Sequence, residues 1–461
     1  MTRRGILISA DGLDRAGTTR LLDALGRWLE RRGRRVETLS AAPSVVVRRA
    51  AGSQRMRPFL DARVAALLSA AELERSTLPA IDAGLPRGSV VLVDRYAWTA
   101  TARAVARGLD PGWVRRLHAF LPRPDLTVYL RLPANRALKE TLAAVPSDGA
   151  LGAAAAAYGP FLERVVTEFD ALASAAGGAD AEPWPTAAVV VEARHPDKAA
   201  AGVRETLKPL LSARPLHQSN GRPRSQPSNR GAGAGRAQVG LPAAGPPGHG
   251  EPGRLIVLEG IDHAGRSTHA ALLERYLRNT GHGVVRTSFG ESSIAGEVLR
   301  EAKRERGWDA TAMVLLYAAD LAERIEHVMR PALRAGLTVI ADRYAYTPAA
   351  RAVARGAAAD WVESMFEFAP RPDLVLLLDL PASLAIARGR QDPAQKAESL
   401  DSAQANDYRD FQAGVARWFA TARGRLGFVR VDASRDLNLV QASIRRSVAS
   451  SDGSTREAAA L

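Results

Sequence analysis

One stretch of the chain combines glycines, a basic residue and a hydroxyl at a spacing that suits phosphate binding. It reads Gly260-Ile261-Asp262-His263-Ala264-Gly265-Arg266-Ser267 and follows the apolar run Leu255-Ile256-Val257-Leu258. Glycines let backbone N–H groups point at phosphate oxygens, and a helix that begins there adds the positive end of its dipole. The pattern fits the phosphate-binding loop G-x-x-x-x-G-K-[ST], with arginine at the lysine position. A glycine turn that only caps a helix is the less favoured alternative.

Two side chains of this loop have expected roles in phosphate chemistry. Arg266 would reach the β and γ phosphates of a triphosphate, and Ser267 would ligate Mg²⁺. Arginine is bulkier than lysine and presents a planar fork, so it could bind a triphosphate and still place the γ phosphate badly. A misplacement of about 1 Å can cost roughly 100-fold in rate. The loop therefore predicts triphosphate binding and leaves the rate of turnover open.

The chain contains one segment twice, at a constant offset of 248 residues. Asp94-Arg95-Tyr96-Ala97 recurs as Asp342-Arg343-Tyr344-Ala345. Residues 94–134 and 342–382 share 24 identical positions out of 41, which predicts a tandem duplication of one domain of about 200 residues. The segment between the copies is rich in Gly, Pro, Ser and Arg and cannot bury enough apolar surface to repay ordering. We expect a first copy over 1–211, a flexible linker over 212–253, a second copy over 254–449 and a tail over 450–461.

Short apolar runs alternate with helical patterns in the second copy. The expected strands cover 255–258, 283–287, 337–341, 374–378 and 427–431, and the expected helices include 267–279 and 311–335, the latter ending at Gly336. Continuous apolar strands separated by helices predict a parallel sheet that is covered on both faces. Each copy is therefore expected to be a three-layer α/β/α domain of the P-loop NTPase type.

The first copy carries an altered phosphate loop, Gly12-Leu13-Asp14-Arg15-Ala16-Gly17-Thr18-Thr19. Thr18 replaces the basic residue, so the cation that bridges the phosphates is missing. Arg15 or Arg20 could compensate for it. The expectation is a degenerate copy with little or no phosphoryl transfer.

Several motifs make the second copy resemble the thymidylate kinase family of P-loop nucleoside monophosphate kinases. The resemblance covers nearly all of the second copy, and the first copy up to Ala134. Its motifs are Leu258-Glu259-Gly260-Ile261-Asp262, Leu315-Leu316-Tyr317-Ala318-Ala319-Asp320, Arg330-Pro331-Ala332-Leu333, Asp342-Arg343-Tyr344, Pro372-Asp373-Leu374 and Val431-Asp432-Ala433-Ser434.

The resemblance implies an ATP- and Mg²⁺-dependent transfer of a phosphoryl group to a nucleoside monophosphate, most simply dTMP. The catalytic residues it implies are Asp262, Arg266, Asp342, Arg343, Arg388 and Arg390. The ATP-binding residues it implies are Gly260, His263, Ala264, Gly265, Arg266, Ser267, Thr268, Asp432, Ala433 and Ser434. The acceptor would contact Asp262, Tyr317, Arg343 and Arg351, and Mg²⁺ would be held by Ser267 and Asp342.

Some of these residues have a structural alternative. Tyr317 could stack on the thymine ring or belong to the core, Arg388 and Arg390 could form a solvated helix face, and the Asp-Arg pair could be a strand-end salt bridge. His263 and His269 lack partners at ligand spacing, so we do not expect a metal site there.

Three departures from the family pattern concern the acceptor. Leu321 stands where the family usually has an arginine that reads the base, Thr347-Pro348 replaces a polar pair, and Arg351 stands where an aromatic is common. Arg351 and Arg355 lie four residues apart, on one face of a helix. The added positive charge could suit another nucleotide, or a more highly phosphorylated or polymeric phosphate. The first copy keeps the pair as Arg103 and Arg107 but has Ser69 in place of Tyr317.

Composition limits the other classes. The chain has no cysteine, which excludes disulfides and thiolate metal sites. No apolar run approaches the roughly 20 residues of a membrane span, and Ile6-Leu7-Ile8 is too short for a signal peptide, so we expect a cytoplasmic protein. The net charge of +14 is attributed to an arginine-rich composition rather than to a nucleic-acid partner.

Two other functions stay open: a nucleotide-binding scaffold without turnover, and a kinase for another phosphorylated acceptor. We also expect the two copies to pair within one chain or the chain to form a homodimer.

Overall fold

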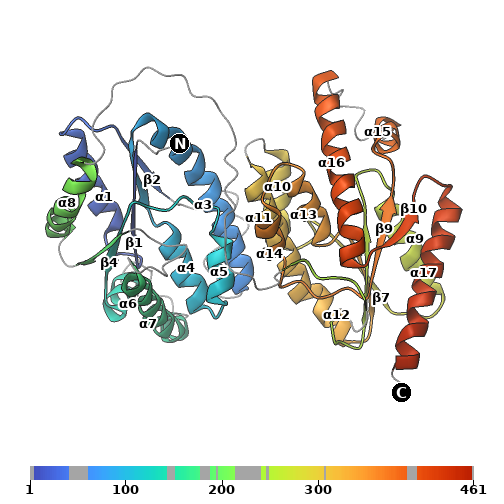
Figure 1. Cartoon of the computed structure of the whole chain (residues 1–461). Coiled ribbons are helices and arrows are strands. Elements are labelled where there is room, and N and C mark those ends of the chain that lie inside the picture. Colours follow the sequence, from blue (N-terminus) through green and yellow to red (C-terminus); the bar gives the residue numbers. More distant parts are fainter. Residues whose placement is uncertain are drawn as a thin grey trace. The chain divides into compact units, whose positions relative to one another are not determined.

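The chain forms two compact units, each with its own five-stranded sheet (Figure 1). The computed structural model describes residues 5–40, 61–142, 151–176, 187–193, 196–212, 240–245, 249–305, 308–391 and 402–458. The N-terminal unit contains the described residues through Ser212, and the C-terminal unit contains those from Gly240 onward. The two units are described separately below.

The N-terminal unit alternates strands and helices along the chain. Its sheet has the strand order β2-β3-β1-β4-β5, and all pairings are parallel. Its elements are β1 (Ile6–Gly12), α1 (Thr18–Glu30), β2 (Val36–Ser40), α3 (Ala62–Gly84), η2 (Leu85–Arg87), β3 (Val90–Asp94), α4 (Ala97–Ala106), α5 (Pro111–Leu117), β4 (Leu126–Arg131), α6 (Ala134–Leu142), α7 (Leu151–Ala175), β5 (Ala188–Glu192) and α8 (Pro196–Ser212).

The C-terminal unit repeats this topology. Read from the opposite edge, its sheet has the order β7-β8-β6-β9-β10, again parallel throughout. Its elements are β6 (Arg254–Glu259), α9 (Arg266–Asn279), β7 (Val284–Ser288), α10 (Ala295–Arg304), α11 (Ala310–Arg324), the π-helical turn η3 (Ile325–Met329), α12 (Arg330–Arg334), β8 (Thr338–Asp342), α13 (Tyr346–Val353), α14 (Ala359–Ser364), β9 (Leu374–Asp379), α15 (Ala382–Gln391), α16 (Ser402–Leu426), β10 (Val429–Asp432) and α17 (Leu437–Ala458).

The central strands are buried along their length because helices cover both faces of each sheet (Figure 1). In the N-terminal unit α1 and α8 pack on one face, and α3, α4 and α7 lie on the other. The predicted parallel α/β fold and the predicted duplication are both confirmed. The central strands β6, β8 and β9 were recognisable because a strand buried on both faces has no polar side to interrupt its apolar run.

The helix predicted over 311–335 differs from the observed structure from residue 325 onward. The observed segment consists of α11, the π-helical turn η3 and α12. Pro331 lies at the start of α12 and has no N–H for the α-helical hydrogen-bond ladder. The wider turn that precedes it joins the two helices without a loop, and the chain then turns at Gly336 as expected.

Part of the segment predicted as a flexible linker lies on the C-terminal unit. Leu241 is buried, the N–H of Ala244 donates to the carbonyl of Leu426 (2.8 Å), and the N–H of Gly245 donates to that of Pro372 (3.0 Å). Residues 213–239 and 246–248 of the expected linker lie outside the described residues. At the other end, α17 continues through Ala458, beyond the expected start of the tail at residue 450. None of the helices in the described ranges combines the length and hydropathy that a membrane span requires.

Candidate active site

The phosphate-type loop connects β6 to α9 at the carboxyl end of the sheet, where open α/β sheets bind their ligands. Gly260, His263 and Gly265 have φ values of 147°, 61° and 88°. A Cβ on Gly260 would lie 2.6 Å from the carbonyl oxygen of Leu378 in β9, so this position requires glycine. Gly265 caps α9 without a side-chain hydrogen bond, which leaves the first N–H groups of the helix directed at the loop.

Arg266 lies inside the loop, and its side chain is only 6% exposed. Its Nη1 donates to the carbonyl oxygens of Gly260 and, at 2.7 Å, Ile261. Nη2 lies 3.5 Å from Asp262 Oδ1, and Nε lies 3.7 Å from Asp342 Oδ1. Burial, aided by the nearby Arg343, lowers the pKa of Arg266 to about 10, so the guanidinium stays charged at neutral pH. The side chain that was expected to reach the β and γ phosphates is therefore bound to the loop itself.

Ser267 and Asp342 form a pair at the loop and the end of β8. The hydroxyl of Ser267 donates to Asp342 Oδ2 at 2.5 Å. Asp342 is buried, and its Oδ1 accepts no hydrogen bond within the described part of the chain. Carboxylate and hydroxyl oxygens are the hard ligands that Mg²⁺ prefers. The buried Oδ1 of Asp342 accepts no hydrogen bond among the described residues and lies 3.7 Å from Arg266 Nε, and it fits the predicted metal position.

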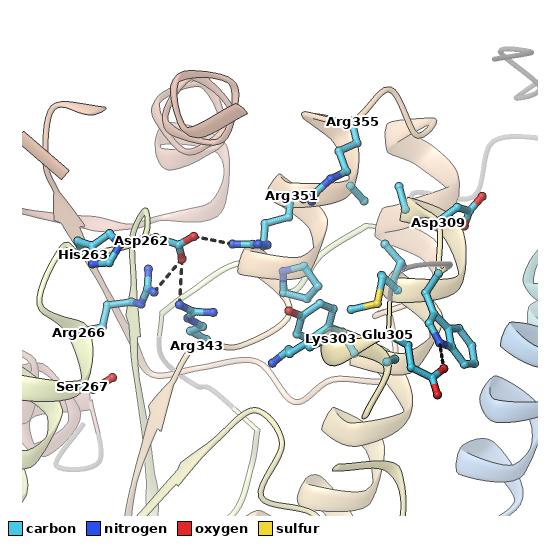
Figure 2. Close-up of a pocket in the computed structure, with 18 of the residues that line it drawn as sticks. Asp262, His263, Arg266, Ser267, Lys303, Glu305, Asp309, Arg343, Arg351 and Arg355 are labelled. Carbon is cyan, nitrogen blue, oxygen red and sulfur yellow. Dashed lines mark hydrogen bonds and ion pairs between the residues drawn. The ribbon is translucent and has the colours of Figure 1, made fainter. Parts of the chain in front are cut away.

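Asp262 joins the loop to the acceptor arginines. Its Oδ1 lies 3.0 Å from Arg343 Nη2, and its Oδ2 lies 2.9 Å from Arg351 Nη1 (Figure 2). Burial opposes ionisation of Asp262, but Arg351, Arg343 and Arg266 together outweigh it and hold the pKa of this carboxyl far below its usual range. The carboxylate is therefore ionised at neutral pH and is compensated by three cations.

Two residues that no motif pointed to also hold Asp262. Gln412 Nε2 donates to Asp262 Oδ2 at 2.8 Å, and Gln412 Oε1 accepts from the backbone N–H of Asp262 at 3.2 Å. The hydroxyl of Tyr408 lies 3.5 Å from Oδ2. Both residues belong to α16, about 150 residues beyond the loop. Their sequence context is an ordinary amphipathic helix, so only the fold reveals them.

A cavity of about 740 Å³ extends from the loop along α11 and α13. Its walls include loop residues of the predicted donor site, together with Arg343, Arg351 and Arg355 (Figure 2). Ligand cavities typically have about 300–1,000 Å³, so a nucleotide fits. The predicted loop residues and the predicted acceptor residues thus border a single space, and Asp432, Ala433 and Ser434 are not among the residues that line it. Arg355 also contacts the face of Phe411, with its guanidinium carbon 3.9 Å from the ring centroid.

Tyr317 lines this cavity and is also largely buried, at 6% exposed. Its ring meets Phe289 edge-on at 5.0 Å, and the ammonium of Lys303 lies 5.1 Å from its centroid. The stacking and core interpretations are therefore compatible, because one edge of the ring packs while the ring still borders the cavity.

Helix α11, which carries Tyr317, has leucine at position 321, where the family usually has an arginine that reads the base. Its own arginine lies at position 324. Leu321 is fully buried, and the arginine three residues further on, Arg324, is buried as well. Arg324 forms an ion pair with Asp320 (3.1 Å) and lies over the ring of Phe289 at 4.5 Å. It is not one of the residues that line the cavity, so it does not replace the missing base-reading arginine.

The predicted lid and adenine-side residues are in contact. Arg388 Nη2 donates to the carbonyl of Ala433 at 2.9 Å. Asp432 accepts from the N–H and hydroxyl of Ser434 at 3.0 and 2.6 Å, which closes a tight turn after β10. The side chain of Arg390 lies outside the described residues.

The histidines contribute no metal site among the described residues. The imidazole of His269 is buried against Gln441 Nε2 at 2.8 Å, and burial, then the charge of Arg388, lowers its pKa. His263 borders the cavity from the loop beside Gly389 of α15. A Cβ on Gly389 would lie 2.8 Å from the His263 ring, so α15 and the loop are closely packed.

The parallel sheet, the glycine loop at the start of α9 and the carboxylate at the end of β8 define a P-loop nucleotide-binding protein. Comparison with known proteins narrows this class. The chain belongs to the thymidylate kinase family, whose model, Thymidylate kinase, matches residues 10–144 and 258–444. The model matches both copies, the first of them through residue 144, which agrees with the duplication. The protein is thus a kinase-type phosphotransferase by family.

Several curated relatives resemble one copy of the chain. A probable thymidylate kinase of Thermococcus kodakarensis is 40% identical over 145 residues, which is 30% of this chain and 71% of that protein. A thymidylate kinase of Leifsonia xyli is 38% identical over 211 residues, 42% of this chain and 93% of that protein. A thymidylate kinase of Thermosipho melanesiensis is 30% identical over 197 residues, 42% of this chain and 96% of that protein.

Proposed function

We propose that the C-terminal unit transfers the γ-phosphoryl group of ATP to the phosphate of dTMP, giving ADP and dTDP. The observation that carries this proposal is the Asp262 cluster. One ionised carboxylate holds Arg343 and Arg351 at the mouth of the cavity beside the phosphate loop (Figure 2). The names of the relatives, all thymidylate kinases, support dTMP as the acceptor.

The residues of the cluster would position the acceptor. Arg343 and Arg351 each use one Nη on Asp262 and keep further N–H groups for the acceptor phosphate. Tyr317 borders the cavity, where it can stack on the base. The acceptor phosphate oxygen would then attack the γ phosphorus, a new P–O bond would form, and the bond to the β,γ-bridging oxygen would break.

ATP, the phosphoryl donor, would be bound by the phosphate loop and by the metal-binding pair Ser267 and Asp342. The N–H groups of α9 would hold the β phosphate, and Arg388 with Asp432, Ala433 and Ser434 would close over the donor. Ser267 and Asp342 would hold Mg²⁺, which supplies charge neutralisation on the phosphates when bound. Thr268, the next residue of α9, borders the same cavity.

One observation favours a second candidate, a nucleotide-binding scaffold without turnover. Arg266 is bound to the loop carbonyls and lies near two carboxylates. It must leave these partners to reach a γ phosphate. If that cost is not recovered, ATP binds and the phosphoryl group is not transferred.

The deciding experiment is ADP release from MgATP by the full-length chain, with dTMP, other nucleoside monophosphates, short polyphosphate and no acceptor. We expect turnover that depends on dTMP and falls at least about 100-fold in Arg343→Ala, because a charge-assisted contact to the acceptor is lost. The exposed Arg417→Ala serves as the charge-matched control. ATP binding without turnover for any acceptor would leave the scaffold, and a preference for another acceptor would replace dTMP.

A further inference from the structure

The N-terminal unit contains the same carboxylate–arginine cluster as the C-terminal unit. Asp14 Oδ1 lies 2.6 Å from Arg95 Nη1, and Asp14 Oδ2 lies 2.8 Å from Arg103 Nη2. These three residues precede Asp262, Arg343 and Arg351 by the same 248 positions. The side chains are 34–40% exposed, so a solute can reach the cluster. Two guanidinium groups and one carboxylate leave it with one net positive charge.

The N-terminal unit also has the hydroxyl–carboxylate pair that was predicted to hold Mg²⁺ in the C-terminal unit. Thr19 Oγ1 donates to Asp94 Oδ2 at 2.5 Å, as Ser267 does to Asp342. Asp94 is buried, at 6% exposed, and its Oδ1 has no hydrogen-bond partner within the described ranges. In the C-terminal unit Arg266 lies near the corresponding oxygen. Thr18 occupies that loop position here, so the position of Arg266 carries no cation in this unit.

The backbone around the cluster is equally unusual in both units. Four non-glycine residues in the described part of the chain have positive φ: Arg15 (72°), Arg95 (62°), His263 (61°) and Arg343 (72°). They occupy the same two positions of each unit, one in the loop and one after the third strand. A non-glycine residue in this conformation costs about 1 kcal/mol or more and is concentrated at binding and catalytic sites. The N-terminal unit therefore carries the strained backbone that presents the first arginine of the cluster.

The two units differ where a base would stack. Tyr317 borders the cavity of the C-terminal unit, whereas the matching Ser69 is an exposed residue of α3. A serine offers no ring for stacking, and base–aromatic stacking is worth about 1–3 kcal/mol per base. Within the described residues, the N-terminal unit thus has the phosphate-binding half of an acceptor site and has a serine at the position of the stacking ring.

We propose that the N-terminal unit is a second ligand site, which binds phosphate monoesters through Arg95 and Arg103 and does not discriminate the base. Arginine forks suit phosphate because two parallel N–H···O bonds form to one group. This proposal goes beyond the transfer reaction and does not depend on turnover by the C-terminal unit. It assigns the N-terminal unit a binding role in place of an inert one.

The test uses the full-length chain with Arg343→Gln and Arg351→Gln, so that the matching cluster of the C-terminal unit is removed. Isothermal titration calorimetry is performed with dTMP and with ribose 5-phosphate, which has no base. We expect one site per chain with affinities for the two ligands that agree within about 3-fold, since no stacking is available. Adding Arg95→Gln and Arg103→Gln should weaken both at least about 10-fold, because two charge-assisted contacts are lost.

The control is Arg87→Gln with Arg115→Gln, two exposed arginines of the same unit, which removes the same charge. Equal weakening by the control, an absence of binding in the starting background, or a retained preference for dTMP would each overturn the proposal. If the variants with Arg95→Gln and Arg103→Gln do not fold, the same titration is performed with Arg95→Lys and Arg103→Lys instead. They keep the charge and lose the fork, so weaker binding is still expected, and unchanged binding would refute the role of the fork.

Discussion

At the scale of residues, the site is organised by the charge of Asp262. Burial of a carboxylate is unfavourable, yet here three arginines, an amide and a hydroxyl surround it. A buried charge is tolerated only when it is paired and hydrogen-bonded, and removing a single partner leaves the rest uncompensated. The cluster therefore fixes the orientation of Arg343 and Arg351 before any ligand binds. Arg266 is part of the same network, and its position sets the first prediction.

Arg266→Lys is expected to raise kcat about 10- to 100-fold, with little change in KM for the acceptor. A lysine ammonium is compact and can reach the γ phosphate without the planar fork that binds the loop carbonyls, and better placement by about 1 Å is worth roughly 100-fold. Steady-state ADP release measures both constants. The exposed Arg275→Lys is the control, and an unchanged or lower kcat would show that Arg266 is not the limitation.

Tyr317 provides a second test at this scale. Tyr317→Ala is expected to raise KM for dTMP about 10-fold or more, because stacking on one base is worth about 1–3 kcal/mol. Tyr317→Phe keeps the ring and should retain affinity within about 3-fold. Thermal unfolding of both variants separates binding from packing. A large fall in Tm for Tyr317→Ala together with an unchanged KM would assign the ring to the core alone.

At the scale of elements, a buried acid connects the first strand of each sheet to the segment after the third strand. Glu259 ends β6 and accepts from the backbone N–H groups of Tyr344 (2.8 Å) and Thr347 (3.1 Å), as well as from the Thr347 hydroxyl. In the N-terminal unit Asp11 of β1 accepts from the N–H and hydroxyl of Thr99 at 2.9 and 2.7 Å. Burial raises the pKa of both acids, that of Glu259 to about 7.

This raised pKa predicts a pH dependence of stability. Between pH 4.5 and 7 the unfolded chain loses the proton of Glu259 while the folded chain keeps it, so the free energy of unfolding falls as the pH rises. One pH unit corresponds to about 1.4 kcal/mol, which gives roughly 3 kcal/mol over this window. Glu259→Gln should flatten the dependence, and the exposed Glu30→Gln should not. Urea unfolding at several pH values measures the free energy of unfolding. If Glu259→Gln leaves its pH dependence unchanged, Glu259 is not the group responsible.

Features of the fold and the site that depend on neighbouring residues could be predicted from the sequence, whereas contacts between residues far apart in the sequence could not. The strands, the loop and Asp342-Arg343 are local patterns, and the sheet topology brings strand ends together, so the meeting of loop and acceptor residues could be expected. The contacts of Gln412 and Tyr408 with Asp262 depend on the packing of α16, which leaves no local signal. The orientation of Arg266 was missed because loop carbonyls compete with a phosphate for the same guanidinium. The break at η3 reflects Pro331, whose effect on a helix near its start is position-dependent.

At the scale of the whole molecule, each unit has its own sheet and its own buried strands. A unit of this kind can unfold as a cooperative element by itself. The offset of 248 residues also supplies matched positions in the two units. Leu25 in α1 and Leu273 in α9 are both fully buried. They allow the stability of each unit to be changed by the same substitution.

Calorimetry of the full-length chain is expected to resolve two unfolding transitions. Leu25→Ala and Leu273→Ala should each cost about 2–5 kcal/mol, because a cavity forms in the core, and each should lower a different transition. Addition of a non-hydrolysable ATP analogue at about 100 times its Kd should raise the transition that Leu273→Ala lowers, by roughly 5–10 °C. A single transition that both variants shift equally would show that the units unfold together.

The shared strand order of the two sheets has a consequence for biosynthesis. The strands β1 and β6 hold the same place in two sheets of the same order. During folding each could pair with the strands of the other unit, a known route to misassembly in repeated domains. The side chains at the strand ends oppose such an exchange. If β6 entered the N-terminal sheet, Glu259 would bring one extra methylene into the buried space in which Asp11 meets Thr99. If β1 entered the C-terminal sheet, Asp11 would be one methylene short of the donors that Glu259 reaches. We therefore expect the single-carbon difference between the two acids to disfavour the exchange of first strands between the two sheets.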